Sequence, residues 1–478
     1  MKTRIILLSL LLCGFASGLQ AQVVESDSAV PDSAASDSAV PYTTIPDSAV
    51  LDSVARLPTS MSFLKKATYS LAGIAGVNLG IWGINRYVLR ANFSSVNSQT
   101  IRYNLKSKFV WDNDLFGTNN FLHPLHGALY YQVTRACGFN FYASIPYIFA
   151  GSLMWEYLME NEQPSINDLI STTVGGIGIG EVVWRIYDRT FNRSRAHRDR
   201  TPIAANVSLG GHLLKPEMNA NYHPYLQLAA DLTYNPDRSE CEKPYDWFEL
   251  GVRVNIGRGR IYINQFHLSG LIWNKVLKET DTETLDVGLY QQFDYLDAPV
   301  KVYSQTPYRM AQVAAFGLGV QYDRKERGGF SLNGQFFLTG VGLGAYLSDY
   351  YWVVDRDYNF GSGFSSALHL VMADEGSGLR LKTRFNYYRL FTWKGYAPER
   401  NLHEEKLTKL DVQGDKGAVN FTHVEAAFGY QSKNGWNLYL VPAYIHRSNT
   451  YAFRPNVTYS AYELIFKVGY LFQFPQKK

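Results

Sequence analysis

Histidine and carboxylate side chains, which most often carry acid–base or metal chemistry, concentrate between residues 111 and 185 of this sequence. The stretch WDNDLFGTNNFLHPLHGALYYQ (111–132) contains two histidines three residues apart, and several carboxylates follow. Two imidazoles with two or three carboxylates can bind a divalent metal ion or act as a general acid–base set. The candidate catalytic residues are His123, His126, Glu156, Glu160 and Asp168, with Glu162 and Glu181 in the same region.

The spacing of these residues matches no strong metal-binding motif. The zincin pattern His-Glu-x-x-His is absent. Glu156 and Glu160 share one helix face, where two like charges are unfavourable unless a cation or metal ion lies between them. If Pro124 occupies the first helical position, His123 caps that helix and His126 follows one turn later.

A structural role is the favoured interpretation of this cluster. Apolar helices tolerate a few polar side chains when these pair with one another in a buried network. Here the acids would pair with the histidines or with Arg135 and Arg185. An active site is the alternative, because ionisable clusters also mark function. We therefore assign no cofactor and leave a metal ion open.

A second candidate site lies in QFHLSG, where His267 and Ser269 would share one face of a strand. A histidine near a serine is the arrangement that a nucleophile and its base require. The His-x-Ser order resembles that of outer-membrane phospholipases and lipid A deacylases, with Asp281 as a third member. Those enzymes carry Asn after the serine, whereas Gly270 follows here, and Asp281 is expected in a distant turn. An accidental match is the favoured interpretation.

The polar cluster belongs to residues 61–198, a region with the pattern of a small helical domain. The pairs Gly76/Gly80 and Gly176/Gly180 have the small-xxx-small spacing that lets helices approach backbone to backbone. Three apolar stretches have helical length, namely 62–89, 142–161 and 165–189.

Residues 199–478 change to the pattern of an antiparallel transmembrane β-barrel. Segments of about 10 to 15 residues, many alternating in polarity, are separated by turn residues. About twelve strands are expected, and a closed bacterial barrel has an even number. The expected strands are 202–214, 222–235, 245–257, 260–273, 285–297, 311–323, 328–343, 363–373, 379–393, 417–431, 435–447 and 459–474.

The connections between these strands predict an orientation. With a periplasmic N-terminus, the long connections 341–363 and 395–416 fall on the extracellular side. The tight links 323–329, 374–378 and 432–435 fall on the periplasmic side. Long outer loops and short inner turns are the expected asymmetry. The last strand ends on an aromatic residue, like the signal that the barrel assembly machinery reads, so this machinery is an expected partner during biogenesis.

The N-terminal residues indicate export. Residues 1–21 have the basic start, short apolar core and small-residue end of a secretory signal peptide. Residues 22–60 repeat an Asp-Ser-Ala/Val triplet without a large apolar face, which predicts a disordered tether. The triplets resemble the Asp-Ser/Thr-aliphatic acceptor of a periplasmic O-glycosylation system of some Gram-negative envelopes, and both a glycosylated and a bare tether stay open. The candidate acceptors are Ser28, Ser33, Ser38, Ser48 and Ser53.

The composition agrees with a barrel in a membrane. The chain has 34 Tyr, 27 Phe and 9 Trp at a mean hydropathy of −0.18, and Tyr and Trp favour membrane–water interfaces. A net charge of +4 does not suggest a nucleic-acid partner. After removal of the signal peptide only Cys137 and Cys241 remain, and their pairing stays open.

Part of the helical domain resembles a known family. The segments WDNDLFGTNNFLHPLHG and SIPYIFAGSLMWEYLMENEQPSINDLISTTVGGIGIGEV, within 111–185, closely resemble an uncharacterised Gram-negative envelope family, domain of unknown function 3943. The ordered motifs His-Pro-x-His-Gly, Glu-x-x-x-Glu, Ser-x-x-Asp-Leu and Gly-Gly make the match specific. The family has no assigned reaction, so the resemblance implies a relationship and no activity.

The sequence therefore predicts an α+β protein of the outer membrane, with a periplasmic helical domain followed by a transmembrane barrel in contact with outer-membrane lipids. The leading function is a structural or transport-related barrel whose helical domain plugs or gates the lumen. The alternative is an envelope lipid- or glycan-modifying enzyme that uses the His/Glu/Asp cluster, and enzymatic activity is left open. The sequence predicts neither a substrate nor an oligomeric state.

Overall fold

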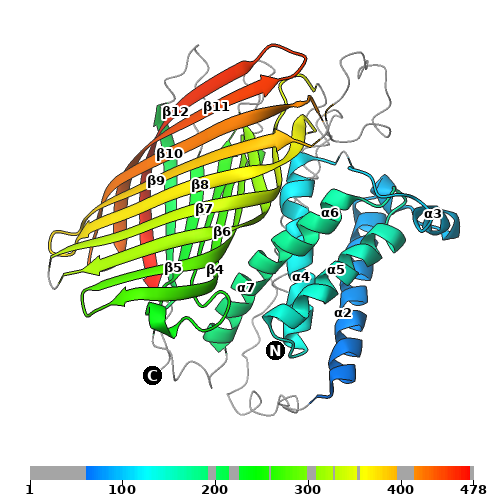
Figure 1. The fold of residues 1–478 in the computed structure, drawn as a ribbon, viewed down its shortest axis with the longest axis horizontal. Coiled ribbons are helices and arrows are strands. Elements are labelled where there is room, and N and C mark those ends of the chain that lie inside the picture. Colours follow the sequence, from blue (N-terminus) through cyan, green and yellow to red (C-terminus); the bar gives the residue numbers. More distant parts are fainter. Residues whose placement is uncertain are drawn as a thin grey trace, which may run out of the picture.

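The computed structural model shows a helical bundle beside a closed antiparallel β-barrel, which confirms the α+β fold (Figure 1). The structure describes residues 61–112, 114–191, 201–214, 226–257, 260–298, 308–326, 329–351, 356–393, 395 and 414–473. The signal peptide (1–21) and the tether (22–60) with its candidate serines lie outside the described residues and stay predictions.

Six α-helices form the described bundle and its surroundings. They are α2 Phe63–Gly83, α3 Ser98–Asn104, α4 His123–Ala136, α5 Phe141–Leu158, α6 Ile166–Ile170 and α7 Gly176–Phe191. The hydroxyl of Ser165 accepts a hydrogen bond from the Asp168 N–H at 3.2 Å and so caps α6. Wider π turns lie at Thr118–Leu122 and Ser171–Gly175, directly before α4 and α7. Because the helical backbone begins before α4, the prediction that His123 caps this helix is wrong.

Glycines permit the close approach of α4 and α7. A methyl group at Gly127 would lie 1.8 Å from the carbonyl oxygen of Thr172, and one at Gly176 would lie 2.6 Å from the Gly127 Cα. A methyl group at Gly180 would lie 2.7 Å from the Tyr131 Cβ. The predicted small-residue packing is therefore confirmed for Gly176 and Gly180.

The same prediction is wrong for Gly76 and Gly80 on α2. A methyl group at either position would meet nothing within 4 Å. This face of α2 has no packing partner among the described residues. Large apolar side chains on the same helix are exposed, including Leu71 and Leu79.

Twelve antiparallel strands form the barrel, and the pairing of β1 with β12 closes it. The strands are β1 Ala204–Leu214, β2 Leu226–Tyr234, β3 Phe248–Gly257, β4 Arg260–Glu279, β5 Glu283–Asp297, β6 Arg309–Lys325, β7 Phe330–Leu347, β8 Tyr358–Asp374, β9 Leu379–Thr392, β10 Gly417–Gln431, β11 Trp436–Tyr451 and β12 Val457–Gln473. Each predicted segment overlaps one of these strands, so the predicted number is confirmed. The connection expected at 341–363 narrows to 348–357, because β7 and β8 extend into it.

The barrel has two distinct ends. At the tight-turn end, short turns such as 375–378 and 432–435 join the strands. At the loop end, longer connections such as 348–357 and 393–416 join them. These connections follow the asymmetry expected from the sequence. Two others depart from it: 235–247 at the tight-turn end is long, and 258–259 at the loop end is short.

Residues of each strand alternate between the lumen and the outside. Arg253 on β3 and Glu425 on β10 form an ion pair although these strands are five positions apart around the ring, so both side chains project into the lumen. The opposite face is apolar over most of the ring, as in membrane-spanning barrels. Exposed outward side chains include Leu209, Leu228, Phe316, Leu318, Phe336, Leu338, Phe364, Phe385, Leu438 and Phe466.

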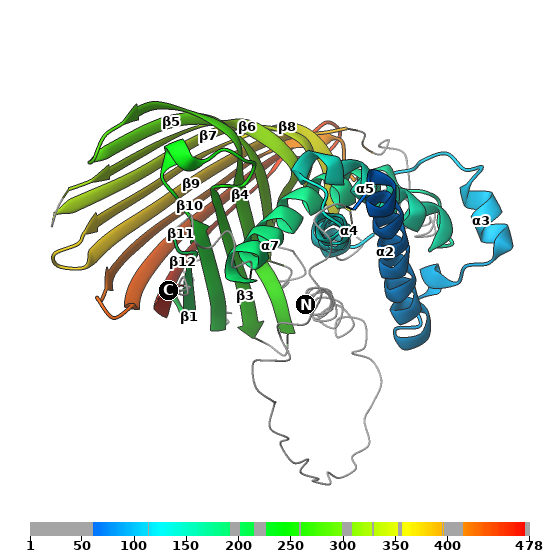
Figure 2. The same cartoon turned by 90° about the horizontal axis from the view of Figure 1, so that it is seen from below.

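The described helices pack against the outer wall of the barrel (Figure 2). The rings of Phe121 and Phe266 meet edge to face at 5.3 Å, and Gln291 Nε2 donates a hydrogen bond to the Val174 carbonyl oxygen at 2.8 Å. Phe266 follows the lumen-facing Gln265, which binds Arg253, so Phe266 points outward. The prediction that the helical domain plugs the lumen is therefore wrong for the described helices. They cover an apolar patch of wall that the sequence pattern cannot distinguish from a lipid-facing surface.

The contacts between bundle and barrel reach both ends of the helices. Near the loop end, the rings of Trp111 and Trp393 meet edge to face at 4.5 Å. At the far end of α7, Arg185 Nη1 lies 2.5 Å from Asp246 Oδ1, in the connection between β2 and β3. The bundle therefore lies alongside the wall instead of below the barrel mouth.

Candidate functional site

The structure brings several of the sequence-predicted residues together where α4, α5 and α6 meet. His123 Nε2 lies 3.4 Å from Asp168 Oδ1. Glu156 Oε2 accepts a hydrogen bond from the Ser165 N–H at 2.7 Å. Tertiary packing thus joins side chains from three segments into one buried polar cluster.

Glu156 and Glu160 have separate hydrogen-bond donors. A proton held by either carboxyl group would remove the repulsion between them. Trp155 Nε1 donates a hydrogen bond to Glu160 Oε2 at 3.2 Å. Burial, followed by the negative charge of Glu156, raises the pKa of Glu160 well above its usual range.

His126 lies apart from these carboxyl groups and has partners of its own. Its Nε2 is 2.8 Å from the hydroxyl of Tyr130, one helical turn away. Its ring contacts the Trp155 ring edge to face at 4.8 Å. These contacts are those of a packed, hydrogen-bonded core histidine.

Asp112 is a member of the cluster that the sequence analysis missed. Its Oδ1 accepts hydrogen bonds from Asn119 Nδ2 at 2.7 Å and Asn167 Nδ2 at 2.9 Å. Its own N–H donates to Asn167 Oδ1 at 3.0 Å. The two asparagines that hold Asp112 do not titrate, so a search for acids and bases does not reveal the contacts that bring Asp112 into the cluster.

Asp114 connects the cluster with the barrel. Arg356, in the connection between β7 and β8, places its Nη2 3.9 Å from Asp114 Oδ1. Partial burial and the nearby charge of Asp112 raise the pKa of Asp114 to about 7, against the opposing effect of Arg356. The hydroxyl of Tyr358 donates to the Asp114 carbonyl oxygen at 2.8 Å.

Glu181 has the partners expected of a structural network. It accepts a hydrogen bond from the Tyr131 hydroxyl at 2.6 Å, and Arg135 Nε and Arg185 Nε lie 3.2 Å and 2.7 Å from its carboxyl oxygens. This pairing confirms the predicted roles of Arg135 and Arg185. Cys137, near the end of α4, and Cys241 are both free thiols.

The helical cluster therefore has the geometry of a buried network. Glu156 and Asp168 are 1 % and 2 % exposed and have several polar partners. None of the cluster residues lines the lumen cavity described below. Nothing in this geometry favours the enzyme alternative.

The barrel lumen is filled at its loop end. Side chains from seven strands meet there in one apolar cluster. Above it, Arg447 binds Asp349 through two hydrogen bonds of 2.7 and 2.8 Å. The cluster contains Leu296, Tyr308, Met310, Ala315, Val341, Tyr346, Tyr388, Leu390, Val419, Phe421, Ile445 and Ala461.

The tight-turn half of the lumen is partly hollow. On its β4–β6 side it is filled by a buried cluster that includes Trp247, Tyr290 and Phe337. A cavity of about 820 Å³ is lined by lumen-facing strand residues and by the turns 375–378 and 432–435. Six cationic side chains, Arg253, Arg380, Lys382, Arg384, Lys433 and Lys467, and four anionic ones, Asp231, Glu249, Glu375 and Glu425, line it. The formal balance of these lining groups is positive.

The second candidate site from the sequence, formed by His267, Ser269 and Asp281, is brought together only in part. His267 and Ser269 share one face of β4, as predicted from their spacing, and this face is the lumen side. However, Ser269 Oγ and His267 Nε2 are buried without a hydrogen-bond partner, so the two side chains do not form a nucleophile–base pair. The carboxylate beside His267 is Asp294 on β5, not Asp281, which lies in the turn after β4.

The fold and the lumen define the class of this protein: an outer-membrane-type β-barrel joined to a lateral helical module. Residues 108–211 match the family model of a domain of unknown function (DUF3943), which confirms the resemblance found in the sequence. No curated protein matches the chain.

Solved barrels are similar only in general form. The NanC porin is 8 % identical, covers 56 % of this chain and 98 % of its own, and has a TM-score of 0.28. The outer-membrane channel DcaP of Acinetobacter baumannii is 10 % identical, covers 56 % and 96 %, and has a TM-score of 0.21. The CymD monoaromatic hydrocarbon channel is 12 % identical, covers 64 % and 97 %, and has a TM-score of 0.22. These similarities are too distant to indicate a solute.

Proposed function

We propose that this protein is a transport- or binding-related outer-membrane barrel whose lumen is a blind polar cavity and not an open diffusion pore. The observation that carries the proposal is the apolar cluster across the loop end of the lumen. Eight-stranded barrels are filled by side chains, whereas barrels of 16 to 18 strands leave a channel. In a barrel of twelve strands, the size of the lumen-facing side chains determines whether the lumen is open. Here large side chains such as Tyr388 and Phe421 fill the loop end of the lumen.

The remaining cavity would admit a polar solute from the tight-turn side. Its volume is in the range of small-molecule sites. The excess of cationic over anionic lining groups favours solutes with anionic groups, because charged clefts concentrate counter-ions.

The helical bundle, in this proposal, lies within the bilayer and braces the barrel wall, instead of lying in the periplasm. The stretch Phe63–Val88 is long and apolar enough to span a membrane, and only 17 % of its most apolar window is buried. In water, the exposed side chains of α2 would form a large apolar patch, which soluble proteins avoid. In lipid, they continue the apolar belt of the barrel.

Conductance in a planar lipid bilayer tests the blind lumen. The wild-type protein should show no steady conductance steps, whereas the double variant Tyr388→Ala/Phe421→Ala should conduct because it removes two rings from the plugging cluster. Phe428→Ala, which changes an exposed outward side chain, is the matched control and should stay closed. Steady open-pore steps in the wild-type protein would contradict the proposal.

Fluorescence quenching tests the position of the helices. In a Cys137→Ser/Cys241→Ser background, a probe at Leu79→Cys should be quenched by brominated lipid chains. The same probe at Ser377→Cys, in a tight turn, should be much less affected. Equal weak quenching at both positions would place α2 in water.

A further inference from the structure

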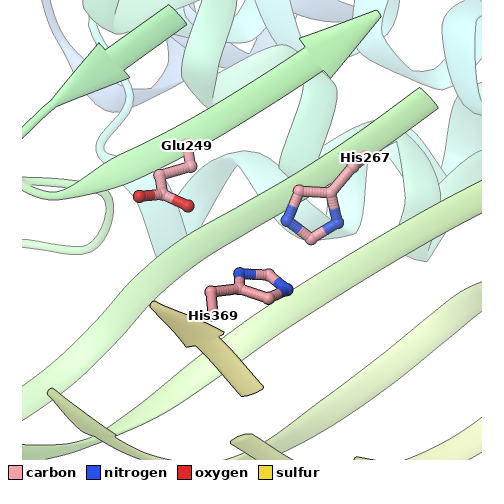
Figure 3. A group of neighbouring side chains, drawn as sticks. All are labelled: Glu249, His267 and His369. Atoms are coloured by element: carbon pink, nitrogen blue, oxygen red, sulfur yellow. The ribbon is translucent and has the colours of Figure 1, made fainter. Parts of the chain in front are cut away.

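Three potential metal ligands meet in the barrel lumen. Glu249 on β3, His267 on β4 and His369 on β8 each offer one ligand atom, and these atoms all lie within 4.8 Å of one another (Figure 3). Strands β4 and β8 are four positions apart around the ring, so closure of the barrel brings them together. Gly251 pairs with His267 across β3 and β4 and contributes no side chain to this space.

Each imidazole has one nitrogen engaged and one without a partner. His267 Nδ1 lies 2.5 Å from Asp294 Oδ1, and His369 Nε2 lies 3.1 Å from Asn386 Oδ1. His267 Nε2 and His369 Nδ1 have no hydrogen-bond partner, although both residues are only 4 % exposed. Buried polar atoms without a partner are rare and call for an explanation.

The engaged nitrogens explain which atoms would bind a metal ion. Because Asp294 and Asn386 each accept through oxygen, the engaged imidazole nitrogens carry the hydrogens. The other nitrogen of each neutral ring is then a free lone pair, which is the form that binds metal. Carboxylate–histidine–metal chains of this kind orient the ligand and increase its basicity.

The supporting side chains are themselves held in place. The Tyr388 hydroxyl donates to Asp294 Oδ2 at 3.0 Å, and Gln335 Nε2 donates to Glu249 Oε1 at 2.8 Å. Preorganised outer contacts of this type are typical of metal sites. A packing role for two lumen histidines does not require this arrangement.

We propose that Glu249, His267 and His369 form a binding site for a divalent transition-metal ion, with Zn²⁺ as the reference ion. Two imidazole nitrogens and one carboxylate oxygen are a donor set that zinc uses when it keeps one position open. Glu249 and Asp294 supply two negative charges that favour a cation, against the positive charge of Arg384, which pairs with His369 across β8 and β9. Glu249 and His369 also line the cavity, so an ion and its fourth ligand can enter from the tight-turn side.

Calorimetric titration of ZnCl₂ into the chelator-treated, full-length protein in detergent tests the site. The wild-type protein should bind one ion per chain, and each of His267→Gln, His369→Gln and Glu249→Gln should weaken binding at least about tenfold. His446→Gln, a strand histidine outside the cluster, is the matched control. Co²⁺ added to the wild-type protein should give visible absorption bands that His267→Gln removes.

Two outcomes would overturn the site: no saturable binding by folded wild-type protein, or equal binding by the double variant His267→Gln/His369→Gln. Heat-modifiable gel migration identifies variants that have not folded. If a ligand variant does not fold, Asn386→Ala is tested in its place. It removes the hydrogen-bond partner of His369 and should weaken zinc binding less than loss of a ligand does. The site does not rest on the proposed function, because zinc titration and bilayer conductance are separate readouts.

Discussion

Arg253 on β3 and Glu425 on β10 form an ion pair across the barrel lumen, with side chains that are 10 % and 9 % exposed. Arg253 Nη1 also donates to Gln265 Oε1 at 2.7 Å, and His423 Nε2 lies 3.3 Å from Glu425 Oε1. The pair joins opposite walls at the lining of the cavity. It therefore bridges the lumen at the cavity.

Removal of one member of this pair should be more harmful than removal of both. Glu425→Gln removes the ion-pair partner of buried Arg253 and should lower the free energy of unfolding by about 3 kcal/mol. The double variant Arg253→Met/Glu425→Met should lower the free energy of unfolding by less, because it leaves neither charge of the pair without its partner. Urea unfolding of the barrel refolded into lipid vesicles measures both.

The ion pair of Arg380 and Glu375, where the turn between β8 and β9 meets β9, provides the control. Their closest atoms are 3.2 Å apart, but Glu375 is about half exposed, so Glu375→Gln should cost less than about 1 kcal/mol. Equal decreases in the free energy of unfolding for Glu425→Gln and Glu375→Gln would show that the pair across the lumen contributes no more to stability than the pair at the turn.

The contact between α4 and α7 should tolerate no side chain at Gly127. Gly127→Ala would force a methyl group into the Thr172 carbonyl oxygen and should separate the helices or cost at least about 2 kcal/mol. Gly76→Ala is the matched control on α2, where the added methyl group meets open space. It should leave stability unchanged or raise it by up to about 1 kcal/mol, since alanine favours helix. Helical circular dichroism during thermal unfolding distinguishes the two, and an equal response would contradict this packing.

The strands could be predicted from the sequence because their signals are local. Alternation of polar and apolar residues and short turns such as 432–435 are read within about ten residues of the chain. The position of the helices could not be predicted in this way. Phe266 and Phe293 on the covered wall have the same outward, apolar character as lipid-facing residues such as Phe316.

The candidate sites likewise depend on contacts between residues far apart in the sequence, which local patterns do not predict. His267 and Asp294 are neighbours through strand pairing, and His369 joins them only after the ring closes. Asp281 is nearer to His267 in sequence than Asp294, yet it lies in the turn beyond β4. In the helical cluster, the spacing of Glu156 and Glu160 predicted proximity correctly, whereas Asp112 is tied to Asn167 by a contact over 55 residues.

Docking of the bundle on the barrel should depend on Phe121. Its ring is 7 % exposed and contacts Phe266 at 5.3 Å and Tyr295 at 5.5 Å. Phe121→Ala should therefore cost about 3 kcal/mol and make the helices sensitive to trypsin while the barrel stays heat-modifiable. Leu79→Ala, at an exposed position of α2, should leave trypsin resistance unchanged. Full resistance of Phe121→Ala would contradict docking through this ring.

The stability of the bundle should fall as the pH rises from about 4 to about 7. The pKa of Asp114 is raised from its usual value of 3.8 to about 7, by partial burial and then by Asp112. The folded protein therefore holds a proton that the unfolded chain has released. Stability falls with pH wherever the folded state binds more protons, and the effect levels off above the folded pKa. Asp114→Asn should flatten the profile of helical unfolding temperature over this range, whereas Asp114→Glu, which keeps a carboxyl group, should preserve its direction. A profile for Asp114→Asn as steep as that of the wild-type protein would show that other groups, such as Glu160, carry the whole effect.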